Sequence, residues 1–220
     1  MPDATPRPLR RDAELNRRRI IEAAREVFGA RGLSATLDDV AAHAGVGVGT
    51  VYRRFPTKEE LLEAAFEERL EEHVRQIEAA LRAPTGWDGL VCFLRVAAET
   101  HAADQGVRDI AFGAGASAGR FERIRDRIFP LVQEVVGRAH TEGSLRSDVT
   151  AGDIPVLLMM VSEVAHRGGS DRPGLFARYL QLLIDGLRSD GGNGDLGPAL
   201  GRADVERLVQ EWLPSGPPRR

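Results

Sequence analysis

The chain has 220 residues, of which 42% are hydrophobic and 29% are charged, and its formal net charge is −3 at pH 7. This length allows a buried core in one domain or in two. The single cysteine, Cys92, excludes an intrachain disulfide, and no apolar run reaches the ~18 residues of a membrane span. Because the amino end also lacks the apolar core of a signal peptide, we expect a soluble cytoplasmic protein that does not enter the membrane.

Charge is divided unevenly along the chain. Residues 1–60 carry 11 basic and 9 acidic side chains, whereas residues 61–220 carry 19 and 24. A weakly basic amino-terminal part on an acidic body is typical of a protein that places one end on nucleic acid.

Residues 1–12 hold three prolines and three arginines. This composition predicts a disordered basic arm, which either reaches along DNA phosphates or into a minor groove, or is simply an unstructured terminus. The apolar spacing that follows, with Ile20, Ala24 and Phe28 on one face, predicts a first helix over residues 13–30.

Residues 37–55, LDDVAAHAGVGVGTVYRRF, have the pattern of two short helices joined by a tight turn. Val40, Ala41 and Ala44 form one apolar face of the first helix. Gly45 then supplies a residue that leaves a helix easily through a left-handed conformation.

The second helix of this stretch is predicted to begin at about Val48. Val51 and Phe55 would face inward, and the outward positions are occupied by side chains of the kinds that contact phosphate: Thr50, Tyr52, Arg53 and Arg54. A helix, a glycine-containing turn and a short helix make up the helix-turn-helix pattern, whose second helix lies in the major groove of DNA.

Over residues 15–66 the sequence resembles the amino-terminal DNA-binding domain of the TetR/AcrR family of bacterial transcriptional regulators. The resemblance implies an all-α protein of about nine to ten helices, in which a three-helix head with the helix-turn-helix precedes a helical domain for ligand binding and dimerisation. The residues that carry it are Ile20, Ile21, Glu22, Ala23, Ala24, Phe28, Arg31, Gly32, Thr36, Val40, Ala41, Ala44, Gly45, Val46, Gly49, Thr50, Val51, Tyr52, Phe55, Lys58, Leu61 and Leu62.

Four residues are expected to bind DNA phosphates by this resemblance. Thr50, Tyr52 and Lys58 match phosphate-binding positions of the family, and the hydroxyl of Thr36 would face a phosphate while it also caps a helix. Such contacts fix the register of the protein on DNA without reading sequence. Tyr52 has the alternative of packing in the core.

The remaining DNA-contacting residues are expected at the two ends of the second helix. Arg53 and Arg54 would reach phosphates or guanine edges. Gly47, Val48 and Gly49 carry no long polar side chain. We therefore expect a thymine-methyl contact from Val48, close approach of the backbone at the two glycines, and a share of shape readout.

Beyond the head the pattern is helical throughout. We expect a head at residues 13–60, a body at 61–190 that binds an effector and dimerises, and a flexible tail at 191–220 with the pattern of a short helix at 204–212. Thr57 with Glu60 caps a long helix to about Arg82. Pro130 is expected to kink or divide a helix. The body helices are predicted at residues 57–82, 87–103, 107–112, 120–141, 154–167 and 175–188.

The resemblance also implies a pocket for a small molecule among the central body helices. Because the candidate lining is mainly apolar with few polar groups, it favours a hydrophobic or aromatic effector. Each candidate is equally plausible as plain core: Trp87, Cys92, Phe93, His101, Phe112, Phe121, Phe129, Met159 and Met160.

The two apolar helices nearest the carboxy end are the candidates for a homodimer surface. In the family the last two body helices pair across a two-fold axis, and the predicted helix at 154–167 is apolar all round, so one of its faces needs a cover. The residues expected in the interface are Leu157, Leu158, Val161, Val164, Phe176, Tyr179, Leu180, Leu183 and Leu187.

We expect a DNA-binding regulator, a repressor that binds a near-palindromic operator as a homodimer and is released by a small molecule. The alternative is a ligand-binding helical bundle without specific DNA binding. An enzyme is the least favoured reading: Gly115–Gly119 fits G-x-S-x-G, but the strand that this nucleophile motif requires is missing. The five histidines lack the spacing of a metal site, so we expect no bound metal. We also expect no cofactor and no catalytic residue.

Overall fold

The computed structural model describes residues 7–112, 120–168, 172, 174–190, 192–201, 203–205 and 207–208. Across these residues the chain is helical, and its β pairing is limited to an isolated bridge between Leu145 and Arg188. The all-α prediction is thereby confirmed. The segments are α1 (Arg7–Arg31), η1 (Gly32–Ser34), α2 (Leu37–Ala44), α3 (Val48–Arg54), α4 (Lys58–Ala80), α5 (Gly86–Ala103), α6 (Gln105–Ala111), α7 (Arg120–Thr141), α8 (Asp153–Gly168) and α9 (Leu175–Leu187).

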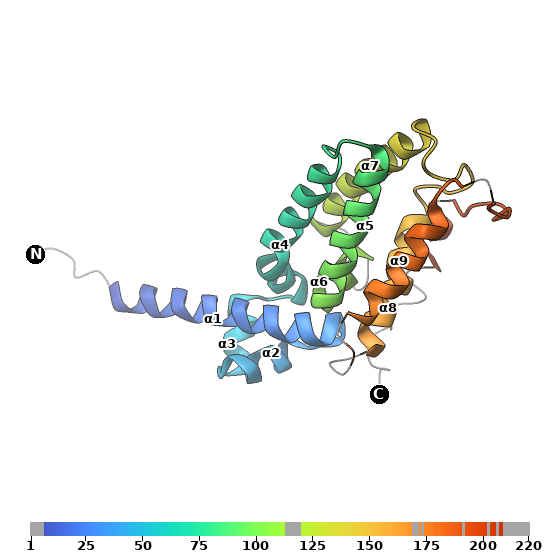
Figure 1. Cartoon of the computed structure of the whole chain (residues 1–220). Coiled ribbons are helices and arrows are strands. Elements are labelled where there is room, and N and C mark those ends of the chain that lie inside the picture. Colours follow the sequence, from blue (N-terminus) through green and yellow to red (C-terminus); the bar gives the residue numbers. More distant parts are fainter. Residues whose placement is uncertain are drawn as a thin grey trace, which may run out of the picture.

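The head consists of α1, η1, α2 and α3, and the other helices form a body that stands on α1 (Figure 1). The apolar face of α1 is buried, with Ile20, Ala24 and Phe28 fully covered. The same core continues into the first half of α4, where Phe66 and Leu70 are buried. The long helix α4 therefore belongs to both parts and joins them mechanically.

The first helix is longer than its apolar pattern predicts. It begins at Arg7 and has 25 residues, so positions 7–12, expected in a disordered arm, are helical. Pro8 does not prevent this, because proline is tolerated in the first turn, where its missing N–H has no partner to lose. The front half of α1 projects beyond the body (Figure 1).

The body packs α4, α5 and α7 together, with α8 and α9 side by side along one edge (Figure 1). Pro130 lies inside α7 and does not divide it. The proline is exposed, whereas Ile124 and Val132 on either side of it are buried, so packing holds the two halves in one helix. The predicted division is wrong.

The segment after α9 is not a free tail where the structure describes it. The Leu196 N–H donates to Asp148 Oδ2 (3.2 Å), and Arg146 donates to the Gly194 carbonyl. Val205 is buried in the body core, and residues 203–205 and 207–208 are helical. Residues 192–201 and 203–205 therefore lie against the loop before α8. The rest of the predicted last helix, to Trp212, lies outside the described residues.

Candidate nucleic-acid interface

The α2–α3 pair has the caps that its sequence predicts. The Asp39 N–H donates to the Thr36 hydroxyl (3.2 Å), and the Asp39 carboxylate accepts from the Thr36 N–H (2.8 Å). The Thr36 hydroxyl also donates to the Asp39 carboxylate (2.7 Å); this bond, the one from the Thr36 N–H and one from the Arg31 guanidinium lower the pKa of Asp39 to about 2. Gly45 ends α2 with a φ of +65°, in the left-handed region. Both ends of α2 are thus fixed by local chemistry.

The two faces of α3 differ as expected. Val51 and Phe55 are buried at 0% and 4% exposure, which anchors α3 on the head core. Tyr52 is 48% exposed, and Arg53 and Arg54 also reach solvent. The alternative that Tyr52 is a core residue is therefore not supported, and the outward face carries one hydroxyl and two guanidinium groups.

The first turn of α3 exposes its backbone at two glycines. An added side-chain carbon at Gly49 would meet nothing within 4 Å, and at Gly47 it would meet only the Thr50 hydroxyl at 3.9 Å. Val48, between them, is 40% exposed. This surface leaves room for the close DNA approach that the sequence predicts, and the base contacts themselves remain predictions.

Three of the predicted phosphate ligands have partners within the protein. Thr36 is in the capping box. Thr50 accepts from Arg53 (3.3 Å). Lys58 is only half exposed: its ammonium donates to the Leu33 carbonyl and lies 5.4 Å from the centre of the Phe28 ring. Burial lowers the pKa of Lys58. This hydrogen bond could not be predicted from the residues near Lys58, because Leu33 lies 25 residues away in the sequence.

The head meets the body through buried polar contacts of α6. The Asp109 carboxylate accepts from the Leu33 N–H of η1 (2.8 Å) and from the Arg108 guanidinium (2.7 Å). Both α6 residues are buried. Gly32 has a φ of +65°, and an added side-chain carbon there would overlap Asp109 Oδ2. The fit between η1 and α6 thus depends on a glycine.

A second set of contacts holds the start of α6. Asp104 caps the helix by accepting from the Val107 N–H (3.0 Å) and forms an ion pair with Arg69 of α4. Gly106 has no room for a side chain, because one would overlap the Phe66 ring. We call Asp104, Arg108 and Asp109 with their head and α4 partners the α6 junction. Sequence analysis missed it because its residues meet only in the fold.

The predicted pocket residues do not form one group. Phe93, His101, Phe112, Phe121 and Met159 are buried, and His101 and Phe112 touch with ring centres 5.0 Å apart. Phe121 belongs to the core shared with the head, and Met159 to the body core. Phe129 is half-buried on α7.

Three of the predicted pocket residues lie apart from the buried ones, and the pocket itself stays a prediction. Cys92 and Met160 are exposed, so neither lines a cavity inside the chain. The guanidinium carbon of Arg188 lies over the Trp87 ring, 4.8 Å from the ring centre. Trp87 and His101 are at opposite ends of α5. Fourteen residues of helix separate Trp87 from His101, which is about 20 Å at 1.5 Å per residue. The apolar periodicity of the sequence located these side chains on helices, but it did not show which face of each helix packs against the rest of the chain.

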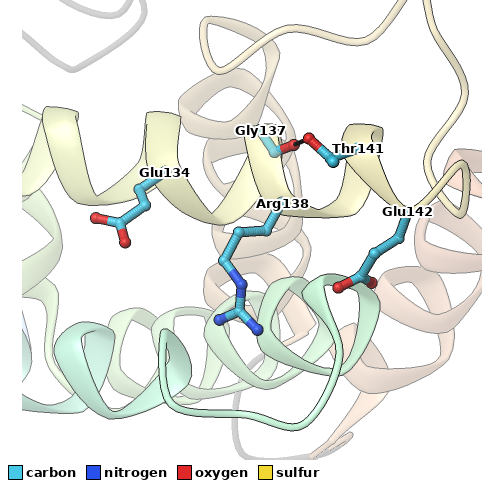
Figure 2. A pocket seen from close by; sticks show the side chains of 5 residues that line it. All are labelled: Glu134, Gly137, Arg138, Thr141 and Glu142. Carbon is cyan, nitrogen blue, oxygen red and sulfur yellow. Dashed lines mark hydrogen bonds between the residues drawn. The ribbon is translucent and has the colours of Figure 1, made fainter.

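An open groove of about 440 Å³ lies along α7, lined by Glu134, Gly137, Arg138, Thr141 and Glu142 (Figure 2). Two of its charged groups, Arg138 and Glu142, form hydrogen bonds that stabilise the fold. Arg138 donates to the Leu81 and Ala83 carbonyls at the end of α4, and Glu142 accepts from the Gly86 N–H at the start of α5 (2.6 and 2.7 Å). These contacts tie the α4–α5 turn to α7, so the groove is structural.

The predicted dimer residues divide into two sets. Leu158, Val161, Leu180 and Leu187 are buried in the core of the chain, so the predicted interface depends on the other residues. Leu157, Val164, Phe176 and Leu183 are half-buried, and Tyr179 is 44% exposed. The analysis missed Leu182, which at 57% exposure is the most open of the large apolar residues on α8 and α9. We call the solvent-facing residues Leu157, Met160, Val164, Tyr179 and Leu182 the α8–α9 stripe.

The described residues contain neither a membrane-spanning helix nor a metal-binding cluster. No helix there is long and apolar enough to cross a membrane. No group of three or more His, Cys, Asp or Glu side chains is arranged to hold a metal ion in that part of the chain. The Gly115–Gly119 nucleophile motif lies outside the described residues.

Comparisons with known proteins agree with this geometry. Residues 20–65 match the family described as "Bacterial regulatory proteins, tetR family", and residues 86–189 match "Transcriptional regulator SbtR-like, C-terminal domain". The chain is 30% identical over 184 residues to the HTH-type transcriptional regulator SrpR of Pseudomonas putida, a match that covers 81% of this chain and 78% of SrpR.

Solved structures give the same result. The TetR transcriptional regulator SCO0520 from Streptomyces coelicolor is 31% identical, with a TM-score of 0.51 over 78% of this chain and 98% of that one. A tetR-family regulatory protein from Rhodococcus RHA1 shares the fold at 23% identity, with a TM-score of 0.59 over 78% and 96% of the two chains. The exposed α3 face on its helix-turn-helix head and these matches lead to one conclusion: the chain belongs to the TetR family of DNA-binding transcriptional regulators.

Proposed function

We propose that this protein is a cytoplasmic repressor that binds a near-palindromic operator as a homodimer and leaves it when a small hydrophobic or aromatic effector binds the body. The observation that carries the DNA-binding part is the outward face of α3. There Tyr52, Arg53 and Arg54 are exposed beside the open backbone at Gly49, while Val51 fixes the helix on the head. This arrangement suits a helix that enters the major groove.

The α8–α9 stripe supports the homodimer. One head contacts a single half-site, so useful specificity needs two heads about one helical turn, or a multiple of it, apart. Exposed Leu182 and Tyr179 and half-buried Val164 form an apolar surface on the two adjacent helices. Apolar surface of this kind favours association with a matching surface.

The α6 junction supports effector release. It joins the head to α4 and α6 through buried hydrogen bonds, so a change in the body can alter the orientation of α3. An effector acts only if it binds the DNA-incompetent arrangement more tightly than the competent one. Repression follows if the occupied operator excludes polymerase.

The test is fluorescence anisotropy of DNA from upstream of the protein's own gene against a scrambled duplex, at two salt concentrations. We expect specific binding that weakens as salt rises. Arg53→Ala should weaken binding and lower the salt slope by about one for each head. Arg82→Ala removes the same charge from an exposed position at the opposite end of α4 and should bind like the parent.

Two results would count against the proposal. Equal, weak binding of both duplexes, with a genome-wide pull-down that recovers no site, would favour the ligand-binding bundle without specific DNA binding. Equal loss in Arg53→Ala and Arg82→Ala would show that α3 does not make the contact.

A further inference from the structure

Two buried histidines lie together inside the body. His73 of α4 is 4% exposed and His101 of α5 is 3% exposed, and their ring centres are 5.6 Å apart. The edge of the Phe112 ring packs against His101. The pair lies near the level of α4 where the core shared with the head, which includes Val74, gives way to the body core, which begins at Ile77.

Three ring nitrogens of this pair have no hydrogen-bond partner in the structure: both nitrogens of His101 and Nδ1 of His73. Burial lowers the pKa of His101 to about 3, with smaller effects from His73 and Arg108, and burial also lowers the pKa of His73. Both rings are therefore neutral at neutral pH. A neutral imidazole has one N–H donor and one bare acceptor nitrogen, and folded proteins pair nearly all such buried groups.

The other three histidines of the chain show that this arrangement is particular to the pair. His43 binds Glu26 (2.6 Å), His140 binds the Arg146 carbonyl (3.2 Å), and His166 binds Gln105 (2.7 Å). All three are at least partly exposed, so water could serve them equally well. His73 and His101, whose nitrogens lack partners, are buried from water, and a missing hydrogen bond costs most free energy in a buried group.

The surroundings limit what the pair can bind. Leu70 and Ile77 on α4 and Ala97 and Ala98 on α5 are buried within one turn of the histidines, so the body of a ligand would be apolar. An anion would lack a free cation, because Arg108 is paired with Asp109. A cation would lack a free carboxylate there, because Asp109 is paired with Arg108 and Asp104 with Arg69. A metal ion would have two histidines but no third ligand among the described residues.

We propose that His73 and His101 are the polar anchor of the effector site and hold the hydroxyl of an uncharged, mostly apolar molecule such as a phenol or an alcohol. A hydroxyl donates to one bare nitrogen and accepts from one N–H, which matches what two neutral imidazoles offer. The inference rests on the proposed function in one respect: it takes the bound molecule to be the effector.

The anchor is placed to act on the head. His101 lies in the last turn of α5, three residues before Asp104, which caps α6 and pairs with Arg69. Asp109, at the other end of α6, holds Leu33 of the head. A ligand that moves His101 therefore moves the start of the α6 junction.

The test uses three small probes of one shape, phenol, anisole and toluene, with the full-length protein. Imidazole ¹⁵N signals are recorded by NMR during each titration. We expect phenol to shift the signals of His73 and His101 in a saturable way, with a dissociation constant about tenfold below those of anisole and toluene. Signals of exposed His43, which binds Glu26 within the head, should stay in place.

Variants separate a specific anchor from general apolar binding. His101→Phe should remove the preference for phenol over toluene, whereas His43→Phe, an exposed position on the head, should keep it. If His101→Phe does not fold, the wild-type titration still decides. Equal binding of phenol and toluene, or His73 and His101 signals that phenol leaves unmoved, would overturn the anchor.

Operator binding is measured in the same samples so that the two proposals can fail separately. Shifted histidine signals with unchanged operator affinity would support the anchor and reject its role as effector site. Specific operator binding with unmoved histidine signals would reject the anchor and leave the regulator intact.

Discussion

Gly32 lies where η1 of the head packs against α6 of the body. Its φ of +65° is a left-handed conformation that costs a residue with a side chain about 1–2 kcal/mol. A methyl group at this position would also overlap the Asp109 carboxylate oxygen that accepts from the Leu33 N–H. Two separate penalties therefore meet at one residue.

Gly32→Ala should lower the free energy of unfolding by more than backbone strain alone explains. The added methyl group has to displace Asp109, and loss of its hydrogen bond to Leu33 costs about 1–3 kcal/mol further. Gly143→Ala is the matched control, since Gly143 has a φ of +68° and open space around it. Urea denaturation of both variants measures the difference, and equal losses would mean that Asp109 does not hold η1.

Several residue roles were predictable because their chemistry is local. Thr36 with Asp39 and Gly45 with the end of α2 act over a few residues, so sequence spacing suffices. The hydrogen bond from Lys58 to Leu33 and that from Leu33 to Asp109 join positions far apart in the chain. No periodicity encodes such contacts, because they exist only when α4 and α6 pack on η1.

At the scale of helices, the start of α5 depends on how closely it approaches α7. An added side-chain carbon at Gly86 would overlap the backbone of Arg138 and Ala139, which has no freedom to move aside. The Gly86 N–H donates to both oxygens of Glu142. The absence of a side chain at Gly86 is what lets these two helices meet.

Alanine at two glycines of these helices should have opposite effects. Gly86→Ala should destabilise the body by about 1–3 kcal/mol, because overlap with fixed backbone cannot relax. Gly137→Ala, on the exposed side of α7 with nothing within 4 Å, should stabilise by about 0.5–1 kcal/mol through helix propensity. Thermal unfolding followed by circular dichroism compares them, and a neutral Gly86→Ala would contradict the close packing.

The sequence pattern predicted which segments are helical, but the residues at which the helices begin and end depend on tertiary packing. The apolar pattern located α4, α5, α7, α8 and α9, since each buries one face. Residues 7–12 of α1 lie ahead of the first buried positions, so the pattern could not show that the helix extends there. The packing of residues 192–201 was also not predicted, because the contacts of Gly194 and Leu196 with the loop before α8 are hydrogen bonds of the backbone.

At the scale of the whole molecule, sequence could not separate the chain's own core from a surface for a second chain. α8 carries apolar residues on all sides, and both kinds of burial need the same side chains. The fold places Leu158, Val161, Leu180 and Leu187 inside the chain and leaves the α8–α9 stripe outside. The candidate interface is therefore narrower than the sequence implied, and its most exposed apolar member, Leu182, was absent from the prediction.

A charge at Leu182 should break the proposed homodimer without unfolding the chain. Leu182→Asp would place a carboxylate in the middle of an apolar contact, and we expect the dimer dissociation constant to rise by about 100-fold, equivalent to ~3 kcal/mol. Leu196→Asp makes the same change at 56% exposure, against 57% for Leu182, but on the segment after α9. Sedimentation velocity at micromolar concentration should show a monomer only for Leu182→Asp.

Loss of the dimer should also weaken binding to operator DNA. Each head binds one half-site, and in a dimer the binding of one head raises the effective concentration of the other at the second half-site. Leu182→Asp should therefore bind operator DNA weakly while its α3 is unchanged, and Leu196→Asp should bind like the parent. If Leu182→Asp instead sediments as a dimer and binds the operator normally, the stripe is not the interface, and the second copy has to dock on another face.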